Sequence, residues 1–174
     1  DKPMEAARAE FAERISALAR SHALLILHEW SGVRLRELIG LELAAHADRV
    51  DVEVDDLTMK PNAAQSMSLV LHELMTNAVK HGALSVPRGQ IRIEGRLGWQ
   101  DHWQVLRFTW EERGGPPVEP PARKGYGSFL IEELLDGIAS ASRIEFRPEG
   151  LFVEAIFPAG QLRPGHEEWS NSTV

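Results

Sequence analysis

Several residue types and patterns are missing from this chain of 174 residues, and each absence excludes a class of protein. There is no cysteine, which excludes disulfide frameworks, thiolate metal sites and cysteine nucleophiles. Acidic side chains outnumber basic ones by 26 to 19, and the formal net charge is −7, so no overall basic field exists to hold nucleic acid. With only 14 glycines and 10 prolines and with 43% hydrophobic residues, the composition favours a packed globular chain.

Long hydrophobic runs are also lacking. The longest wholly apolar stretches have about five residues, as at residues 23–27, whereas a helix that spans a membrane needs about 20. We therefore expect a soluble chain without membrane contact, and the absence of cysteine agrees with a cytoplasmic location. The length suits one large domain with an appendage.

The N-terminal segment has the composition of a long helix. Residues 3–27 contain no glycine and are rich in alanine, glutamate, arginine and leucine, which predicts a helix. Its apolar positions recur at a spacing of about 3.5 residues, as in a coiled-coil seam. The seam consists of Met4, Phe11, Ile15, Leu18, His22 and Leu25. We interpret it as the contact surface for a partner helix, and the alternative is that it packs on the rest of the chain.

Hydrophobic periodicity predicts the remaining elements. Helices are expected at residues 33–47, 61–81 and 128–136, and strands at residues 51–55, 90–97, 103–110, 142–147 and 151–157. Pro61 suits the first turn of the long helix and Gly82 ends it. The four later strands form two hairpins, and the segment between them, residues 113–124, is a proline-rich loop.

This order of elements predicts an α+β fold, with helices layered on one face of a mostly antiparallel sheet. A Rossmann domain is excluded because strands and helices do not alternate and the glycine fingerprint is incomplete. We expect three parts: the helix within residues 1–29, a body at residues 30–158, and a polar tail at residues 159–174.

One cluster of polar residues on the long helix suggests chemistry. Glu73 and Asn77 are four residues apart and share one side of the helix, and Lys80 and His81 follow one turn later. Carboxylate and amide oxygens suit Mg²⁺, while a lysine suits phosphate. The alternative is a solvated helix face with a hydrogen bond between Glu73 and Asn77. A zinc protease site is disfavoured, because Thr76 stands where that motif needs a second histidine.

Three segments, in order, resemble the boxes of one protein family. Residues 72–85 are similar to the N box of the HWE class of sensor histidine kinases, a branch of the gyrase, Hsp90, histidine kinase and MutL ATPase superfamily. Residues 109–116 resemble its Trp-x-Glu box with Gly-Gly-Pro, and residues 123–127 resemble its second glycine box. The resemblance runs from about Glu5 to Pro158, and it implies a Bergerat-type two-layer α/β sandwich that binds ATP.

The resemblance also implies roles for matching residues. Glu73 and Asn77 would hold Mg²⁺ or its water shell, Glu73 and Lys80 would act at the phosphates, and Glu112 would take the place of the Asp that reads the adenine amino group. The other expected nucleotide contacts are His81, Gly114, Gly115, Arg123, Gly125, Tyr126 and Gly127. For Trp110 a core position is at least as favoured as ligand contact, and His72 is interpreted in the same way.

A phosphoacceptor histidine is not evident. None of the seven histidines lies in the His-Arg-x-x-Asn-like context expected from the family, and residues 11–27 resemble the second helix of the family's hairpin. His22 lies on the seam and is therefore not assigned as acceptor. The resemblance therefore implies that residues 1–29 are the second helix of a dimerisation and phosphotransfer hairpin whose first helix is absent. The start at Asp1, without a leader, agrees with a cut boundary at this point.

The predicted function is that of the ATP-binding catalytic domain of a two-component sensor histidine kinase, at residues 30–158, with ATP and Mg²⁺ as cofactors. The expected partners are a response regulator and a second copy that meets the N-terminal helix. One alternative is a phosphotransfer or dimerisation protein of the same fold that does not bind ATP, which the retention of Glu73, Asn77 and Glu112 disfavours. Another is a superfamily ATPase or protein-serine kinase, which the Trp-x-Glu box disfavours.

Overall fold

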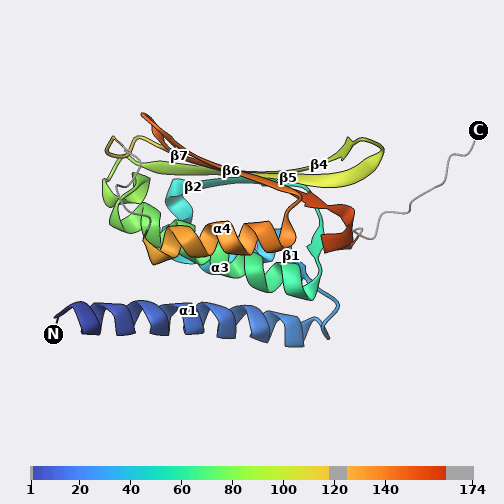
Figure 1. Cartoon of the computed structure of the whole chain (residues 1–174), viewed down its shortest axis with the longest axis horizontal. Helices are drawn as coiled ribbons and strands as arrows, with labels where there is room; N and C mark the ends of the chain where they lie inside the picture. Colours follow the sequence, from blue (N-terminus) through green and yellow to red (C-terminus); the bar gives the residue numbers. More distant parts are fainter. Residues whose placement is uncertain (1, 118–124, 164–174) are drawn as a thin grey trace, which may run out of the picture.

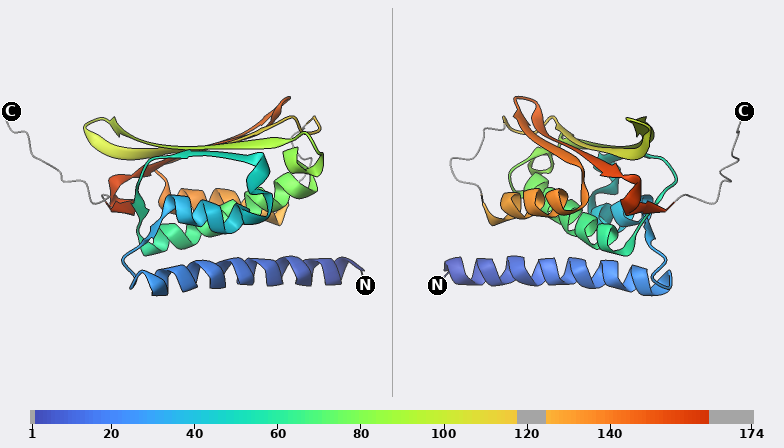
Figure 2. Two further views of the ribbon diagram at one scale, coloured as in Figure 1. Left: turned by 180° about the vertical axis from the view of Figure 1, so that it is seen from behind. Right: turned by 45° about the vertical axis from the view of Figure 1, so that its right-hand side comes forward.

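Three layers stack in the computed structural model, which describes residues 2–117 and 125–163. Helices α2 (Leu35–Leu43), α3 (Pro61–Lys80) and α4 (Tyr126–Ile138) cover one face of a five-stranded sheet, and α1 (Lys2–Leu27) lies beneath them (Figure 1). The views in Figure 2 agree, and no helix of the described residues covers the other face of the sheet. The predicted α+β fold is confirmed.

The large sheet is mostly antiparallel, as predicted. It contains β2 (Val50–Val54), β4 (Gln90–Gln100), β5 (Trp103–Arg113), β6 (Ala141–Arg147) and β7 (Gly150–Pro158), in the order β2-β4-β5-β7-β6. Only the pair of β2 and β4 is parallel within this sheet. The two predicted hairpins are present, and they are joined to each other through β5 and β7.

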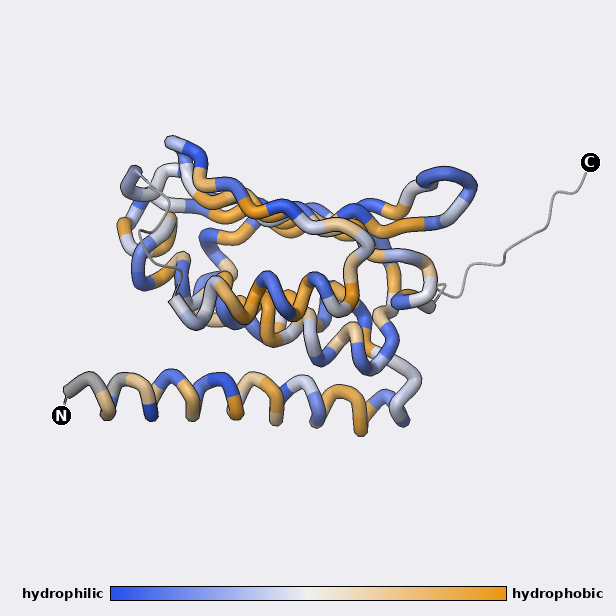
Figure 3. Tube along the Cα trace, in the orientation of Figure 1, coloured by the Kyte–Doolittle hydropathy of each residue, from blue (hydrophilic) through white to orange (hydrophobic). Residues whose placement is uncertain are grey.

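Alternation along the strands separates the core from the open face of the sheet. On β5, Phe108 and Trp110 are fully buried, whereas Arg107 and Arg113 are exposed. The buried residues of β5 and β7 pack on the apolar side of α3, where Leu71 lies. Figure 3 shows the same alternation of hydrophilic and hydrophobic positions in the sheet. The core therefore lies between the sheet and the helices, and it fixes the position of α3.

The predicted helix at 33–47 is too long at both ends. Val33–Arg34 forms strand β1, which pairs with β3 (Thr58–Met59), and β3 pairs with β8 (Leu162–Arg163). Residues 44–49 form the 3₁₀ segment η1 (Ala44–Arg49). The predicted apolar face is confirmed, since Leu35, Leu38, Ile39 and Leu43 are all buried.

The polar tail begins later than predicted. Residues 159–161 form η3 (Ala159–Gln161), and Leu162 in β8 is only 7% exposed. The expectation of a tail from residue 159 is therefore wrong for five residues, because an apolar side chain and strand pairing hold them on the body. Residues 164–174 of the predicted tail lie outside the described residues.

Other element boundaries also differ from the prediction. Helix α4 starts at Tyr126 and ends at Ile138, two residues beyond the predicted range at each end. The turn between β4 and β5 contains only Asp101 and His102, both with positive φ, at 47° and 71°, as a two-residue hairpin loop requires. A short 3₁₀ segment, η2 (Ala83–Ser85), follows α3.

Helix α1 packs on α3 through one face and leaves most of the predicted seam exposed. Ala17, Ser21 and Leu25 are fully buried. Met4, Phe11, Ile15 and Leu18, called the apolar stripe below, are between 38% and 67% exposed. Of the seam residues, only Leu25 is buried against the rest of the chain. The alternative of packing within the chain therefore explains this residue alone. Hydrophobic positions recur along α1 in Figure 3. No helix in the described part of the chain is long and apolar enough to span a membrane.

Candidate functional site

The predicted polar cluster on α3 faces the start of α4. Glu73 is only 2% exposed and Asn77 is half-buried. A Cβ atom placed on Gly127 would lie 2.6 Å from Glu73 Oε2, so the Glu73 carboxylate lies directly against the first turn of α4. The Asn77 side chain makes no hydrogen bond within residues 2–117 and 125–163, which leaves its amide oxygen available to a ligand.

Glu73 is paired with a residue of α1. Arg14 Nε lies 2.5 Å from Glu73 Oε1, and Arg14 Nη2 lies 2.9 Å from Glu73 Oε2. The guanidinium also lies 5.0 Å from the centroid of the Tyr126 ring. The alternative of a solvated helix face is therefore wrong for Glu73, whose partner comes from another helix and not from Asn77.

Lys80 and His81 lie at the end of α3. Lys80 Nζ donates a hydrogen bond to Glu10 Oε1 of α1 at 2.6 Å, and this bond lowers the pKa of the Glu10 carboxyl. His81 is the C-terminal cap residue of α3 and its side chain is exposed. Both of the predicted catalytic side chains, Glu73 and Lys80, thus contact α1.

A second cluster surrounds Glu112, which is 2% exposed. The backbone N–H of Ala83 donates to Glu112 Oε2 at 2.7 Å, and Trp110 Nε1 donates to Glu112 Oε1 at 3.2 Å. Burial raises the pKa of Glu112, against the lowering effect of these two hydrogen bonds. Trp110 is fully buried in the core, in agreement with the core position favoured from the sequence. The hydrogen bond from its indole to Glu112 was not predicted. The i, i+2 spacing on one face of a strand is the signal that could have indicated it.

The glycines after β5 bring the chain close to the turn after α3. Gly114 has φ of +70°, which favours glycine. A Cβ atom on Gly115 would lie 2.7 Å from the Cα of Ala83. Ala83 thereby joins Glu112 and Gly115 in one cluster, and the last turns of α3 connect this cluster to Glu73.

The predicted second glycine box forms the start of α4. Gly125 is the N-cap residue, Tyr126 is the first helical residue, and Tyr126 is 64% exposed. The first backbone N–H groups of a helix have no partner within the helix and can bind an anion. Arg123 lies outside the described residues.

Comparisons with known proteins agree on one family. A family model described as HWE histidine kinase matches residues 1–58. The blue-light-activated histidine kinase of Brucella anthropi is 32% identical over 153 residues, which cover 85% of this chain and 31% of that protein. Its counterpart in Brucella ovis is 31% identical over 159 residues, which cover 88% of this chain and 32% of that protein. The chain belongs to the HWE histidine kinase family.

Solved structures share the fold of this HWE histidine kinase chain. The histidine kinase domain of Erythrobacter litoralis EL346 blue-light activated histidine kinase matches 86% of the chain and 75% of that domain, with a TM-score of 0.68 and 17% identity. The catalytic domain of histidine kinase ThkA matches 74% of the chain and 95% of that domain, with a TM-score of 0.51 and 18% identity. The chain spans about a third of the length of the curated relatives that it matches.

The donor set fits the magnesium nucleotide that the family implies. No group of three or more His, Asp or Glu side chains gathers as metal ligands within the described ranges. Mg²⁺ bound with a nucleotide usually takes one or two protein oxygens and completes its shell with phosphate and water. Glu73 and Asn77, one turn apart beside the start of α4, supply such a pair.

A buried network of charged and polar side chains, which was not predicted, includes His72, the residue before Glu73. Glu42 of α2, fully buried, accepts hydrogen bonds from Arg20 at 2.9 Å and from Ser68 at 2.8 Å, and His72 Nδ1 lies 3.6 Å away. Burial opposes ionisation, but the contacts with His72, Arg20 and Ser68 lower the pKa of Glu42. His72 thus contacts Glu42, in agreement with its interpretation as a packing residue. The network joins α1, α2 and α3.

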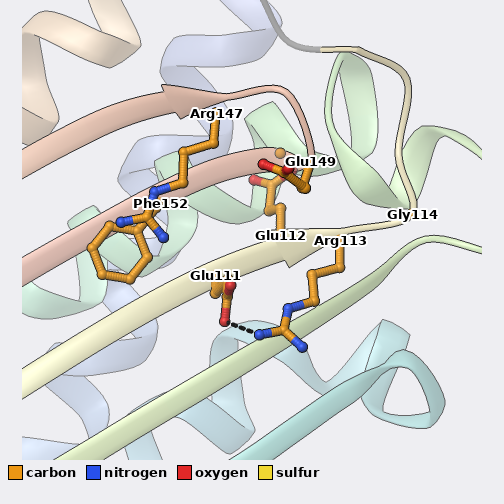
Figure 4. Close-up of a pocket in the computed structure, with 8 residues that line it drawn as sticks. Glu111, Glu112, Arg113, Gly114, Arg147, Glu149 and Phe152 are labelled. Atoms are coloured by element: carbon orange, nitrogen blue, oxygen red, sulfur yellow. Dashed lines mark hydrogen bonds and ion pairs between the residues drawn. The ribbon is translucent and has the colours of Figure 1, made fainter.

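A pocket of about 430 Å³ lies at the same end of β5 as Glu112 (Figure 4). Gly114 and Glu112 line it together with charged side chains of the open sheet face. Arg113 pairs with Glu111 at 2.8 Å. Arg147 pairs with Glu145, and its guanidinium lies 3.7 Å from the centroid of the Phe152 ring. These cations already have partners within the chain, and neither Glu73 nor Asn77 lines this pocket.

Proposed function

We propose that this chain is the ATP-binding catalytic domain of a two-component sensor histidine kinase, together with the second helix of its dimerisation and phosphotransfer hairpin. The observation that carries the proposal is the arrangement along α3. Buried Glu112 lies against Ala83 after the end of the helix, and Glu73 and Asn77 lie one to two turns earlier beside the start of α4. A nucleotide that extends along α3 would meet a base acceptor at one end and phosphate ligands at the other.

Glu112 would accept a hydrogen bond from the exocyclic amine of adenine. A carboxylate can accept about four hydrogen bonds, and Glu112 uses two. An acceptor in a buried site discriminates against a base that presents a carbonyl oxygen at that position, because two acceptors would then face each other unpaired. The site therefore favours ATP over GTP.

The phosphates would lie between α3 and α4. The first N–H groups of α4 and the Lys80 ammonium would hold phosphate oxygens. Glu73 and Asn77 would hold Mg²⁺, which when bound neutralises phosphate charge in the transfer. The chain's own contribution is position and fixed charge, which is the main requirement of phosphoryl transfer.

The transfer joins the γ-phosphorus to an imidazole nitrogen, while the bridging bond to the β-phosphate breaks and ADP leaves with the electron pair. We propose that the accepting histidine lies on a segment outside this chain. Two histidines of this chain contact acidic side chains: His72 contacts Glu42, and His28 Nε2 lies 3.0 Å from Glu37. A response regulator is the proposed recipient of the phosphoryl group, and this role is implied by the family alone.

Calorimetric titration of the chain with Mg-ATP and with Mg-GTP tests the proposal. We expect saturable ATP binding, with GTP weaker by about tenfold or more. Absence of binding for both nucleotides at millimolar concentration would favour the alternative of a phosphotransfer or dimerisation protein that does not bind ATP. Equal affinity for the two would remove the role of Glu112 in reading adenine.

A further inference from the structure

Helix α1 contacts the nucleotide-site residues through charged side chains. Arg14 binds both carboxylate oxygens of Glu73, at 2.5 and 2.9 Å, and Glu10 accepts the hydrogen bond from Lys80 at 2.6 Å. Under the proposed function, Glu73 contacts Mg²⁺ together with Asn77, and Lys80 contacts phosphate. Glu73 and Lys80 therefore each have an alternative partner on α1.

The pair between Arg14 and Glu73 is well formed. The Arg14 side chain is 16% exposed and that of Glu73 is 2% exposed. A two-point contact between guanidinium and carboxylate is among the stronger polar interactions, and removal from water strengthens its attraction further. The Tyr126 ring, 5.0 Å from the guanidinium, adds a cation–π contact at the first turn of α4.

A guanidinium and a magnesium ion cannot share this carboxylate without cost. Both oxygens of Glu73 already accept from Arg14, and a divalent cation placed against the same oxygens would be repelled by the guanidinium charge in a site with little water. We propose that Arg14 competes with Mg-ATP for Glu73, so that the docking of α1 and the loading of the nucleotide site oppose each other. This inference rests on the proposed function.

The two halves of α1 differ in burial. Among the described side chains of residues 4–16, Arg14 is the only one that is not exposed. The second half is anchored, with Ala17, Ser21 and Leu25 fully buried. Movement of the first half would therefore break the pairs at Glu73 and Lys80, while the fully buried side chains of α1 all belong to the second half.

The coupling is reciprocal by linkage. If docked Arg14 weakens the binding of Mg-ATP, bound Mg-ATP must weaken the docking of α1 by the same factor. The position of α1 would then report whether the site is loaded, and a signal that moves α1 would change nucleotide affinity. Nucleotide without metal should have a smaller effect, because the competition takes place at the metal ligand.

Nucleotide titrations of three variants test the competition. Arg14→Gln should bind Mg-ATP about tenfold more tightly than the wild type, and it should need less Mg²⁺ for half-saturation. Arg14→Lys keeps the charge but loses the two-point contact, and it should fall between them. Arg8→Gln is the matched control, since it removes the same charge from an exposed position of α1, and its affinity should equal that of the wild type.

Hydrogen exchange of the wild-type chain gives a second readout that does not depend on activity or on any variant. Mg-ATP should speed the exchange of amides in residues 4–16, whereas ATP with EDTA should leave them nearly unchanged. Unchanged or weaker Mg-ATP binding in Arg14→Gln, with wild-type binding intact, would overturn this inference alone. Slower exchange of residues 4–16 with Mg-ATP would also overturn it. Absence of nucleotide binding in all variants would overturn the proposed function and the inference with it.

Discussion

At the scale of single residues, the buried acid of the site is held by two donors of different origin. The Ala83 N–H fixes one oxygen of Glu112 from the turn after α3, and the Trp110 indole fixes the other from the same strand. Trp110 is fully buried, so it both packs in the core and orients the carboxylate. Under the proposed function, a carboxylate held in this way is oriented before the adenine amine arrives, which would favour binding.

We predict that Glu112→Ala weakens the binding of Mg-ATP by about 1 to 3 kcal/mol, because the adenine amine and the two buried donors all lose their acceptor. Glu111→Ala is the matched control, since Glu111 is the neighbouring acid on β5 and pairs with Arg113. Successive side chains of a strand point to opposite faces of the sheet, and Glu111 is accordingly less buried than Glu112. Glu111→Ala should leave the affinity unchanged. Calorimetry measures both, and equal affinity of Glu112→Ala and the wild type would contradict the adenine assignment.

A second prediction concerns pH. Burial raises the pKa of Glu112, so the folded chain binds this proton more tightly than the unfolded chain does, and stability falls as the pH rises from the ordinary glutamate range through the raised pKa. Glu112→Gln stays neutral and lacks this fall. The free energy of unfolding of Glu112→Gln minus that of the wild type should therefore increase with pH across this range and then level off. Urea unfolding at several pH values measures it, and a difference that decreases with pH would contradict the sign.

At the scale of elements, periodic segments are predictable and short pairings are not. Helix α3 and the strands of both hairpins follow from hydrophobic periodicity, because each buries one continuous face. The strands β1, β3 and β8 have two residues each, too few to carry a period. Their partners are distant in the sequence: Val33 of β1 pairs with Met59 of β3, and Thr58 of β3 pairs with Arg163 of β8. For the same reason the predicted helix at 33–47 included Val33 and Arg34.

Part of the candidate site is likewise predictable from the sequence, and part is not. The motif spacing on α3 predicts that Glu73 and Asn77 share a face, and the resemblance adds Glu112 and the glycines. The contact of Arg14 with Glu73 joins residues 59 positions apart, and no local pattern signals it. Glu42 is likewise undistinguished in the sequence, because its role arises from Arg20, Ser68 and His72, which lie on two other helices.

The apolar stripe of α1 supports a prediction about self-association. Phe11 is 63% and Ile15 is 50% exposed, and an exposed seam at coiled-coil spacing suits a partner helix. Ile15→Glu should shift a self-associated chain toward the monomer in sedimentation velocity. Ala9→Glu adds the same charge at another exposed position of α1 and should not. An identical oligomeric state for the wild type and Ile15→Glu would contradict a contact through the stripe.

At the scale of the whole molecule, helix α1 has two faces that differ in their contacts. One face carries Arg14 and contacts Glu73 of α3, and the other carries the apolar stripe, which is exposed within the described residues. A partner that binds the stripe need not displace Arg14, but it would fix the orientation of α1 relative to α3. Under the proposed function, assembly through the stripe and nucleotide loading would therefore be connected through α1.

This arrangement leads to a prediction for the isolated chain: it binds ATP but does not autophosphorylate. A nucleophile held near the γ-phosphate supplies most of the effective concentration for the transfer, and we propose that this histidine lies on a segment outside the chain. After incubation with labelled Mg-ATP, acid and base treatment separates acid-labile phosphohistidine from acid-stable phosphoserine. We expect neither on this chain, and acid-labile label on a longer chain that adds the preceding segment of the same protein. Strong acid-labile label on the chain itself, mapped to His22 or His28, would make that histidine the acceptor and contradict the proposal.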